Sequence, residues 1–236
     1  MTQSPILEVQ DLKTHFFTRT GVVKAVDGVS IHLNAGETLG IVGESGCGKS
    51  MTALSIMGLV PQPAGRIVGG RILLDGENLL EKTQAEMQEV RGRKVCMILQ
   101  DPMTSLNPVY TVGEQVVETL RMRTGSRLGD LKERGIDLLN RVKISSAAER
   151  MGSFPHQMSG GMNQRVVGAI ALAGGPKVLI ADEATTSLDA TIQYQYLQLL
   201  RDLQADTGLS IIFITHDFGI VAHMCTRVAV MYAGKV

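Results

Sequence analysis

Residues near the start of the chain have the types and spacing of a phosphate-binding loop. The pattern Gly-x4-Gly-Lys-Ser runs from Gly43 to Ser50, directly after an apolar run from Leu39 to Val42. Glycines let successive backbone N–H groups turn inward around phosphate oxygens, and the N-terminus of a following helix adds positive potential. Lys49 supplies a positive charge, and the Ser50 hydroxyl can bind Mg²⁺. The segment therefore predicts a phosphate site, and a simple tight turn before a helix is the weaker alternative.

Two carboxylates stand at the end of a second apolar run. Asp182 and Glu183 follow Val178 to Ala181, and ligands of parallel sheets collect at the carboxyl ends of the strands. We expect Asp182 to hold Mg²⁺, directly or through water, and Glu183 to polarise a water molecule in line with a terminal phosphate. The alternative is a strand that merely ends in acidic loop residues, and the phosphate loop upstream makes it the weaker one.

Three other polar segments could reach the same edge of a sheet. Ser159 precedes Gly160 and Gly161 at the start of a helical pattern, so its hydroxyl predicts an N-cap and the glycines permit close approach by an anion. Gln100 and His216 each follow a strand-like run. An amide there could contact Mg²⁺ or the attacking water, and an imidazole could hydrogen-bond a phosphate. Each would be commonplace alone, as a cap or a surface residue, and their order along the chain favours a shared site.

The elements that must position these residues have an α/β order. Residues 6–42 have a β-rich pattern punctuated by glycine, and helical periodicity fills the stretch between Gln100 and Ser159. The last third alternates helix 160–173, strand 177–182, helix 190–205, strand 210–214 and helix 217–224, which is typical of a parallel sheet. The sequence therefore predicts an α/β core that carries an inserted helical subdomain.

Composition narrows the class of protein. The 236 residues are 44% hydrophobic and 19% charged, so the chain should fold. Its formal net charge of zero removes the global electrostatic case for binding nucleic acid or an anionic membrane surface. Three cysteines without a Cys-x-x-Cys spacing indicate neither a disulfide framework nor a zinc site, and they fit a reducing cytoplasm. Because no run of about 18 apolar residues occurs, we expect the chain not to span a membrane alone.

The ordered motifs closely resemble the nucleotide-binding subunit of an ATP-binding cassette (ABC) transporter, over nearly the whole chain. The resemblance implies a P-loop NTPase of ABC type, with a mixed-sheet core, an N-terminal antiparallel β subdomain and an inserted helical subdomain. It implies an ATP-binding core of residues 1–99 and 160–236 and a helical subdomain of about residues 101–158. Similar chains continue in a further C-terminal region, so this chain is expected to be truncated or a short variant.

The resemblance also implies a role for each motif, with ATP and Mg²⁺ as cofactors. Glu183, His216 and Gln100 would be catalytic, and Ser50, Gln100 and Asp182 would bind Mg²⁺. An aromatic residue would stack on adenine; Phe16 aligns best, and Phe17 stays open. The residues implied to bind ATP are Phe16, Gly43, Glu44, Ser45, Gly46, Cys47, Gly48, Lys49, Ser50, Met51, Ser159, Gly160, Gly161, Met162 and, in the segment from Ser187, Asp189.

Three segments narrow the resemblance to the importers of oligopeptides and dipeptides, a branch that includes nickel importers. These segments are Ile98 to Pro108, Phe154 to Gln157 and Ser159 to Met162. The branch implies an ATPase that powers import of peptides or similar small solutes, bound peripherally at the cytoplasmic face of the cell membrane. Expected partners are a second ATP-binding subunit, identical or different, two membrane permease subunits and a periplasmic or extracellular solute-binding protein. The two ATP-binding subunits would form a head-to-tail dimer, with each ATP between the phosphate loop of one and Ser159 to Gly161 of the other.

Two rival functions stay open at this point. A soluble ABC-type ATPase acting on nucleic acid or ribosomes would need a long coiled-coil insertion or basic tracts, and the sequence shows neither. A non-catalytic nucleotide switch is disfavoured by the intact Lys49, Asp182, Glu183 and His216. Ala184, Asn163 and Gly174-Gly175 depart from the proline, arginine and polar pair that the resemblance leads us to expect. None of these differences removes a catalytic atom, so we expect an active ATPase with slower turnover. At Asn163 we expect a weaker attraction for phosphate, because the positive charge of an arginine is absent.

Overall fold

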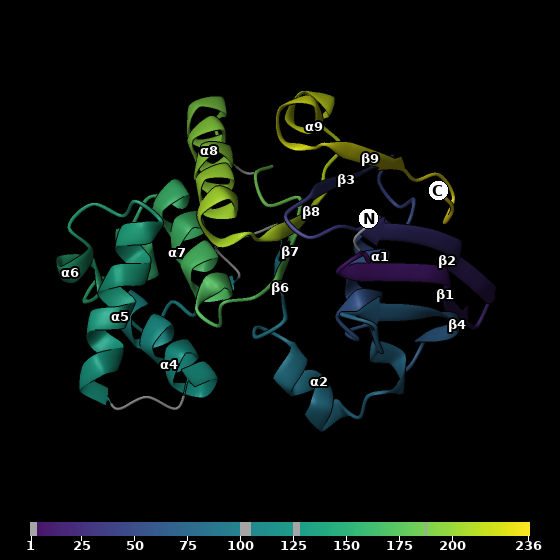
Figure 1. Cartoon of the computed structure of the whole chain (residues 1–236), viewed down its shortest axis with the longest axis horizontal. Coiled ribbons are helices and arrows are strands. Elements are labelled where there is room, and N and C mark those ends of the chain that lie inside the picture. The colour runs from purple at the N-terminus through teal and green to yellow at the C-terminus, as the bar shows by residue number, and fades with distance from the viewer. Residues whose placement is uncertain (1–3, 100–104, 125–127, 187) are drawn as a thin grey trace.

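The computed structural model describes residues 4–99, 105–124, 128–186 and 188–236 (Figure 1). Two sheets lie on one side of the molecule and a group of helices lies on the other. Helix α1 (Lys49–Ile56) packs against strands of both sheets, which brings them into one body.

The N-terminal sheet is antiparallel and has the strand order β2-β1-β4-β5. These strands are β1 (Leu7–Thr18), β2 (Gly21–Leu33), β4 (Gly65–Leu74) and β5 (Glu77–Asn78). Alternate side chains on β1, such as those of Leu7 and Val9, are buried in the core while their neighbours are half-buried. This period of two places one face of the sheet on the core.

The second sheet has the order β6-β7-β8-β3-β9, and each of its neighbouring strand pairs is parallel. Its strands are β6 (Val95–Ile98), β7 (Val178–Asp182), β8 (Ser210–Ile214), β3 (Thr38–Val42) and β9 (Arg227–Val230). Every residue of β3, β7 and β8 is buried. Parallel strands covered on both faces require such continuous apolar runs, and these runs made the strands visible in the sequence.

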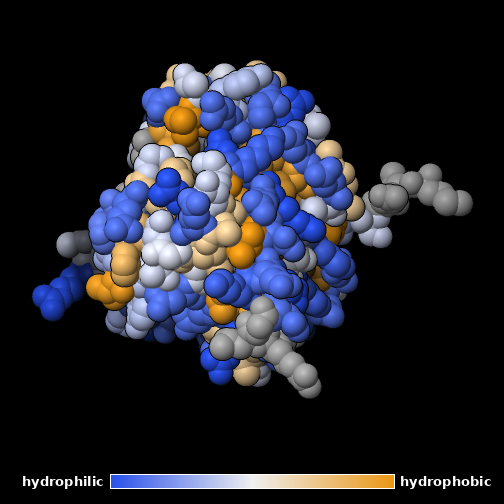
Figure 2. All heavy atoms as spheres, turned by 90° about the vertical axis from the view of Figure 1, so that its left-hand side faces the viewer, coloured by the Kyte–Doolittle hydropathy of each residue, from blue (hydrophilic) through white to orange (hydrophobic). Residues whose placement is uncertain are grey.

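Helices of the insert share one hydrophobic core with a face of the parallel sheet. They are α4 (Val112–Thr124), α5 (Leu128–Arg141), α6 (Ala147–Arg150) and the 3₁₀ turn η2 (Pro155–Gln157). Helix α7 (Gly160–Leu172) packs against α4 and α5 as well as β6 and α8 (Ala190–Thr207). In α5, Leu131 and Leu139 are buried while Lys132 and Glu133 are exposed. The face over these helices is accordingly mainly hydrophilic, with scattered apolar side chains (Figure 2).

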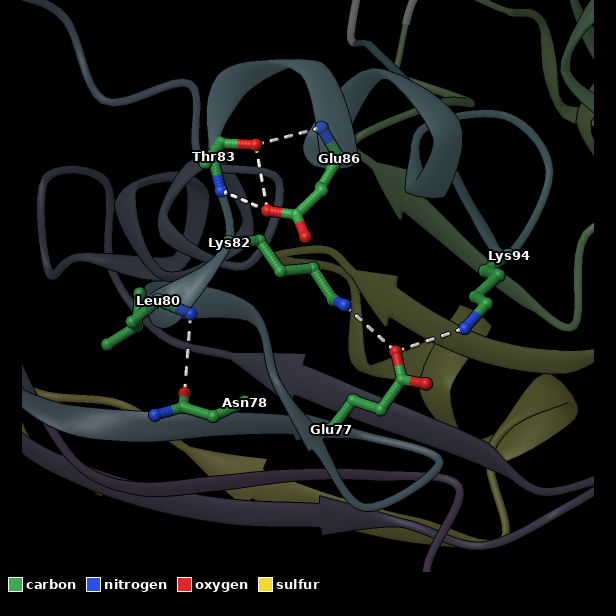
Figure 3. A network of polar contacts seen from close by, with 7 residues as sticks. All are labelled: Glu77, Asn78, Leu80, Lys82, Thr83, Glu86 and Lys94. Atoms are coloured by element: carbon green, nitrogen blue, oxygen red, sulfur yellow. Dashed lines mark hydrogen bonds and ion pairs between the residues drawn. The ribbon is translucent and has the colours of Figure 1, made fainter.

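A polar network fixes the segment between the two sheets (Figure 3). Thr83 and Glu86 form a capping box at the start of α2 (Gln84–Val90), after the 3₁₀ turn η1 (Leu79–Glu81). Glu77 on β5 forms ion pairs with Lys82, at 2.9 Å, and with Lys94, at 3.2 Å. Lys94 directly precedes β6, so the network joins the edge of the antiparallel sheet to the entry into the parallel one.

The expected fold class is confirmed, since antiparallel and parallel sheets and a helical part are all present. Within the described residues the core sheet holds only parallel strands, because the antiparallel strands form their own sheet.

The helix after Lys49 ends at Ile56, before the expected stop at the prolines, because Gly58 adopts a left-handed φ of +62°. Helix α9 (Phe218–Met224) lies where the sequence predicts a helix over 217–224, and β9 follows it. No helix among the described residues is both long and apolar enough to cross a membrane.

Candidate active site

The loop between β3 and α1 has the backbone that a phosphate cradle needs. Gly46 and Gly48 have φ values of +81° and +110°, which L side chains rarely adopt. A Cβ atom at Gly48 would lie 2.3 Å from the carbonyl oxygen of Ala25, so only glycine fits there. The N–H of Gly234 donates to the carbonyl of Cys47 at 2.9 Å. Contacts from β2 and from the end of the chain therefore hold the loop from outside.

Lys49 lies at the first turn of α1 with only 4% of its surface exposed. Its Nζ donates to the carbonyl oxygens of Gly43 and Glu44, at 2.8 and 2.9 Å. The loop therefore holds the ammonium group by neutral carbonyls, which do not cancel its positive charge.

Ser50 and Asp182 bring a hydroxyl and a carboxylate together at the carboxyl end of the parallel sheet. Ser50 Oγ donates to Asp182 Oδ1 at 3.1 Å, and Asp182 is 7% exposed. Burial raises the pKa of Asp182, and the charge of Glu183 adds to this rise, which the Ser50 hydrogen bond and Lys49 only partly oppose. A buried carboxylate short of positive charge beside a hydroxyl has the oxygen ligands that Mg²⁺ prefers. Ser50 and Asp182 therefore fit a magnesium ion.

Glu183 and His216 face each other from the ends of β7 and β8. Glu183 Oε1 lies 3.6 Å from His216 Nδ1, with side chains 19% and 58% exposed. Glu183 has a φ of +48°, a left-handed conformation that is uncommon for residues other than glycine. Its N–H donates to the carbonyl of Ile214 at 2.9 Å, which ties this unusual backbone to β8. Five other non-glycine residues among those described also have a positive φ, so it is the position of Glu183 at the carboxyl end of the sheet that marks it as a site residue.

The segment from Ser159 to Met162 forms the start of α7 as expected. Ser159 caps the helix by accepting a hydrogen bond from the N–H of Met162 at 3.3 Å. A Cβ at Gly160 would meet open space, whereas one at Gly161 would lie 2.5 Å from Ile192 Cγ2 on α8. Gly160 thus leaves the helix start open to a ligand, and Gly161 permits close packing on α8.

Asp189 caps the neighbouring helix α8. One oxygen of its carboxylate accepts hydrogen bonds from the N–H groups of Thr191 and Ile192, both at 3.0 Å. Within the chain its immediate role is therefore that of a helix cap.

The two glycine-rich helix starts are not brought together within one chain. In Figure 1, α7 lies on one side of β7 and α1 on the other. Helix α1 packs against β1, β2 and β7, whereas α7 packs against α4, α5, α8 and β6. The chain therefore assembles Gly43–Ser50, Asp182, Glu183 and His216 at one site, and presents Ser159–Gly161 elsewhere.

Two predicted site residues, Gln100 and Ser187, lie outside the described residues. Phe16 is half-buried on β1, where a Cβ at Gly65 would lie 2.9 Å from its ring. Phe17 is 47% exposed, and the Arg66 guanidinium lies 5.7 Å from its ring centroid. Either ring could still be the aromatic that receives adenine.

Buried amides next to the site are what sequence reasoning missed. Asn163, expected to weaken phosphate electrostatics, is fully buried and donates through Nδ2 to the carbonyl of Pro155 at 2.9 Å. Gln164, also fully buried, donates through Nε2 to the carbonyl of Ala184 at 2.7 Å. The only sequence signal was two amides in a helix whose other inward residues are apolar.

Comparison with known proteins gives consistent matches. The model of the ABC transporter family matches residues 26–186. The probable peptide ABC transporter ATP-binding protein y4tR of Sinorhizobium fredii is 50% identical over 231 residues, which cover 98% of this chain and 69% of that protein. The oligopeptide transport ATP-binding protein OppD of Bacillus subtilis is 53% identical over 231 residues, which cover 98% and 64%. The chain thus spans about two thirds of the length of these relatives.

Solved structures agree at the level of the fold. A dimeric post-hydrolysis state of the ATP-binding cassette MJ0796, bound to ADP and Pi, superposes with a TM-score of 0.85 at 25% identity, covering 98% of this chain and 96% of that one. The protein cbiO1 of Clostridium perfringens, part of the transporter complex cbiONQ, gives a TM-score of 0.84 at 28% identity, covering 99% and 87%.

Proposed function

Because the chain belongs to the ABC transporter family, as one of its ATP-binding subunits, we propose that it hydrolyses ATP to power the import of peptides or similar small solutes. The observation that carries the ATPase assignment is the convergence of Lys49, Ser50, Asp182, Glu183 and His216 at the carboxyl end of one parallel sheet. The solute class is supported by relatives at 46–53% identity whose names specify peptide transport or peptide import.

Each group has a distinct task in hydrolysis. The loop N–H groups and Lys49 bind the phosphates of ATP, and Ser50 and Asp182 hold Mg²⁺, with Gln100 as a further proposed ligand. When bound, Mg²⁺ neutralises charge that develops on the phosphate oxygens. Glu183 orients a water molecule and accepts its proton as the water oxygen bonds to the γ-phosphorus and the bond to ADP breaks. His216, 3.6 Å from Glu183, donates a hydrogen bond to the γ-phosphate.

A dimer completes the site. The chain presents Ser159 to Gly161 away from its own phosphate loop, so we propose that this segment binds the ATP held by a partner subunit. Solved structures whose descriptions name dimeric cassettes share this fold. ATP would then favour the closed dimer through contacts that exist only there, and hydrolysis would remove them.

Two membrane permease subunits and an external solute-binding protein are the further proposed partners, which places the chain at the cytoplasmic face of the membrane. The proposed permease contact lies on the helical subdomain, residues 101–158, as opposed to the core of residues 1–99 and 160–236. A hollow of about 640 Å³ there is lined by residues of α4, α5, α6 and the turn after α6, including Val117, Ala148 and Met151. The rival function on nucleic acid has no support from the zero net charge or from the relatives' names.

Replacing the proposed base tests the proposal. Glu183→Gln should bind Mg²⁺–ATP as well as the unchanged chain does and release phosphate about 100-fold more slowly, because an amide cannot accept the proton of water. Equilibrium ATP binding and phosphate release measure the two quantities. Asp206→Asn, at an exposed carboxylate near the end of α8, is the control and should keep full turnover. Turnover of Glu183→Gln at the unmutated rate would refute the assignment.

A further inference from the structure

The turn that follows Glu183 is held by glutamine amides from two helices. Gln164 of α7 donates through Nε2 to the carbonyl of Ala184 at 2.7 Å, and both residues are fully buried. Gln193 of α8 reaches the next residue, with its Nε2 3.3 Å from Thr185 Oγ1 and 3.4 Å from the Thr185 carbonyl oxygen. Two successive residues of the turn, Ala184 and Thr185, therefore accept hydrogen bonds from glutamine side chains of the helices.

The turn needs such support because its backbone is strained. Glu183 has a φ of +48°, a conformation that persists only where surrounding contacts impose it. The next residue is alanine, which has neither a ring to fix φ nor a side chain that could bond to a neighbour. Backbone hydrogen bonds of the turn include those from Glu183 N–H to the Ile214 carbonyl at 2.9 Å, from Thr186 N–H to the Glu183 carbonyl at 3.2 Å and from Leu188 N–H to the Thr185 carbonyl at 3.2 Å.

The Gln164 bond is the shortest of these, and it is fully buried beside the side chain of Tyr196. A Cβ at Gly168, one turn further along α7, would lie 3.4 Å from the Tyr196 hydroxyl. Burial raises the pKa of Tyr196, and the neighbouring Gln164 side chain partly offsets this rise. Loss of the Gln164 donor would leave the Ala184 carbonyl buried without that hydrogen bond, a change that favours movement of the turn.

We propose that Gln164 is a positioning residue for Glu183. By fixing the Ala184 carbonyl, it sets the direction in which the preceding carboxylate leaves the backbone, and Gln193 assists at Thr185. The inference rests on the proposed role of Glu183 in hydrolysis. The two glutamines would then affect the rate of hydrolysis as well as the packing of the helices. A displacement of about 1 Å at a catalytic group can lower the rate about 100-fold.

The test compares two glutamines that make the same kind of bond at opposite ends of the parallel strands. Gln164→Met keeps the length and nearly the volume of the side chain and removes the donor. Gln204→Met is the matched control, because Gln204 donates to the carbonyls of Gly36 and Leu209 at 3.2 and 3.1 Å, before β3 and β8. We expect Gln164→Met to lower kcat about 10- to 100-fold with an unchanged KM for ATP, and Gln204→Met to leave kcat unchanged.

Hydrogen exchange gives a readout that does not depend on turnover. In the nucleotide-free chain, the amides of residues 184–186 should exchange faster in Gln164→Met than in the unchanged chain, and should be unaffected in Gln204→Met. Gln193→Met should give a smaller change of the same sign, which keeps the proposal testable should Gln164→Met fold poorly.

Three results would overturn the proposal. They are an equal loss of kcat in Gln164→Met and Gln204→Met, a change in KM alone, or unchanged exchange at residues 184–186. Failure of the proposed function is distinguishable from these. Faster exchange in Gln164→Met together with full turnover in Glu183→Gln would support the hold on the turn and refute only the catalytic role of Glu183.

Discussion

At the scale of the residue, Lys49 is a buried lysine whose ammonium group is held by neutral carbonyl oxygens. Its ammonium group is 2.8 and 2.9 Å from two loop carbonyls, so the fold stores a positive charge at the place where a phosphate must arrive. We expect Lys49→Ala to weaken ATP binding about 10- to 150-fold, because a charge-assisted hydrogen bond contributes about 1.5–3 kcal/mol. Calorimetric titration with Mg²⁺–ATP measures this loss.

Lys24 provides a control for that prediction. It lies on β2 next to the loop-contacting Ala25, is largely exposed, and forms an ion pair with Asp27 at 3.5 Å. Lys24→Ala removes the same net charge from the same region of the molecule. An equal loss of affinity in both variants would mean that Lys49 acts only through long-range charge.

The residues that could be identified from the sequence are those whose role follows from the spacing of their near neighbours. Lys49 and Ser50 follow their glycines directly, and Asp182 and Glu183 follow an apolar run, so motif and strand end coincide. Gln164 and Gln193 could not be identified, because their partners Ala184 and Thr185 lie 20 and 8 residues away and meet them only after α7 and α8 pack on the sheet. Nothing in local spacing signals such a contact.

At the scale of the element, one ion pair links three strands. Arg227 on β9 donates to Glu37, just before β3, through Nε at 2.8 Å and Nη2 at 3.2 Å, and also to the carbonyl of His32 on β2. Burial alone would raise the pKa of Glu37, but hydrogen bonds from Arg227 and from the N–H of Asn34 outweigh it and hold the pKa below its ordinary value. The pair therefore stabilises the folded chain while Glu37 is ionised.

The sign of the shift fixes the pH dependence. A lowered pKa contributes stability that is present above the unfolded value, about 4.3, and lost as the pH falls through the folded value. We expect Glu37→Gln to lower Tm at pH 7 by about 2–4 °C, from a loss of about 1 kcal/mol. Below about pH 4 the difference should shrink. Thermal unfolding across pH measures it, with exposed Glu149→Gln as control, and a difference that grew on acidification would contradict the assignment.

Elements were predictable from sequence where burial imposes a strict pattern. Strands β7 and β8 are buried at every position, and the apolar runs in the sequence marked them within one residue of their observed bounds. Helix α8 runs to Thr207, two residues beyond the expected end, because Gly208 supplies the left-handed residue that ends it. Local propensity is a weaker guide to such ends, since the residue that stops a helix need not interrupt its apolar period.

At the scale of the whole molecule, α7 joins two functions. Its first residues, Ser159 to Gly161, form the proposed contact with the ATP of a partner subunit, and Gln164, one turn on, holds the turn after Glu183. Because α7 is one rigid element packed on α8 and β6, a shift of its first residues also displaces Gln164. A head-to-tail dimer would thus couple nucleotide contact at one site to the geometry of the catalytic turn at the other.

Complementation between inactive variants tests that arrangement. At an ATP concentration that leaves the weakened site empty, Lys49→Ala disables the phosphate loop, and Ser159→Arg blocks the opposing segment with a bulky charge. A mixed dimer has one site with both halves intact, so an equal mixture should recover about a quarter of full turnover, since half of the dimers are mixed and one of their two sites works. Mixing Lys49→Ala with Glu183→Gln is the control and should recover nothing, because both changes lie on the loop side and each site of the mixed dimer carries one of them. If the first mixture stayed as inactive as its components, a site shared between two copies of this chain would be refuted, and the partner subunit would have to be a different chain.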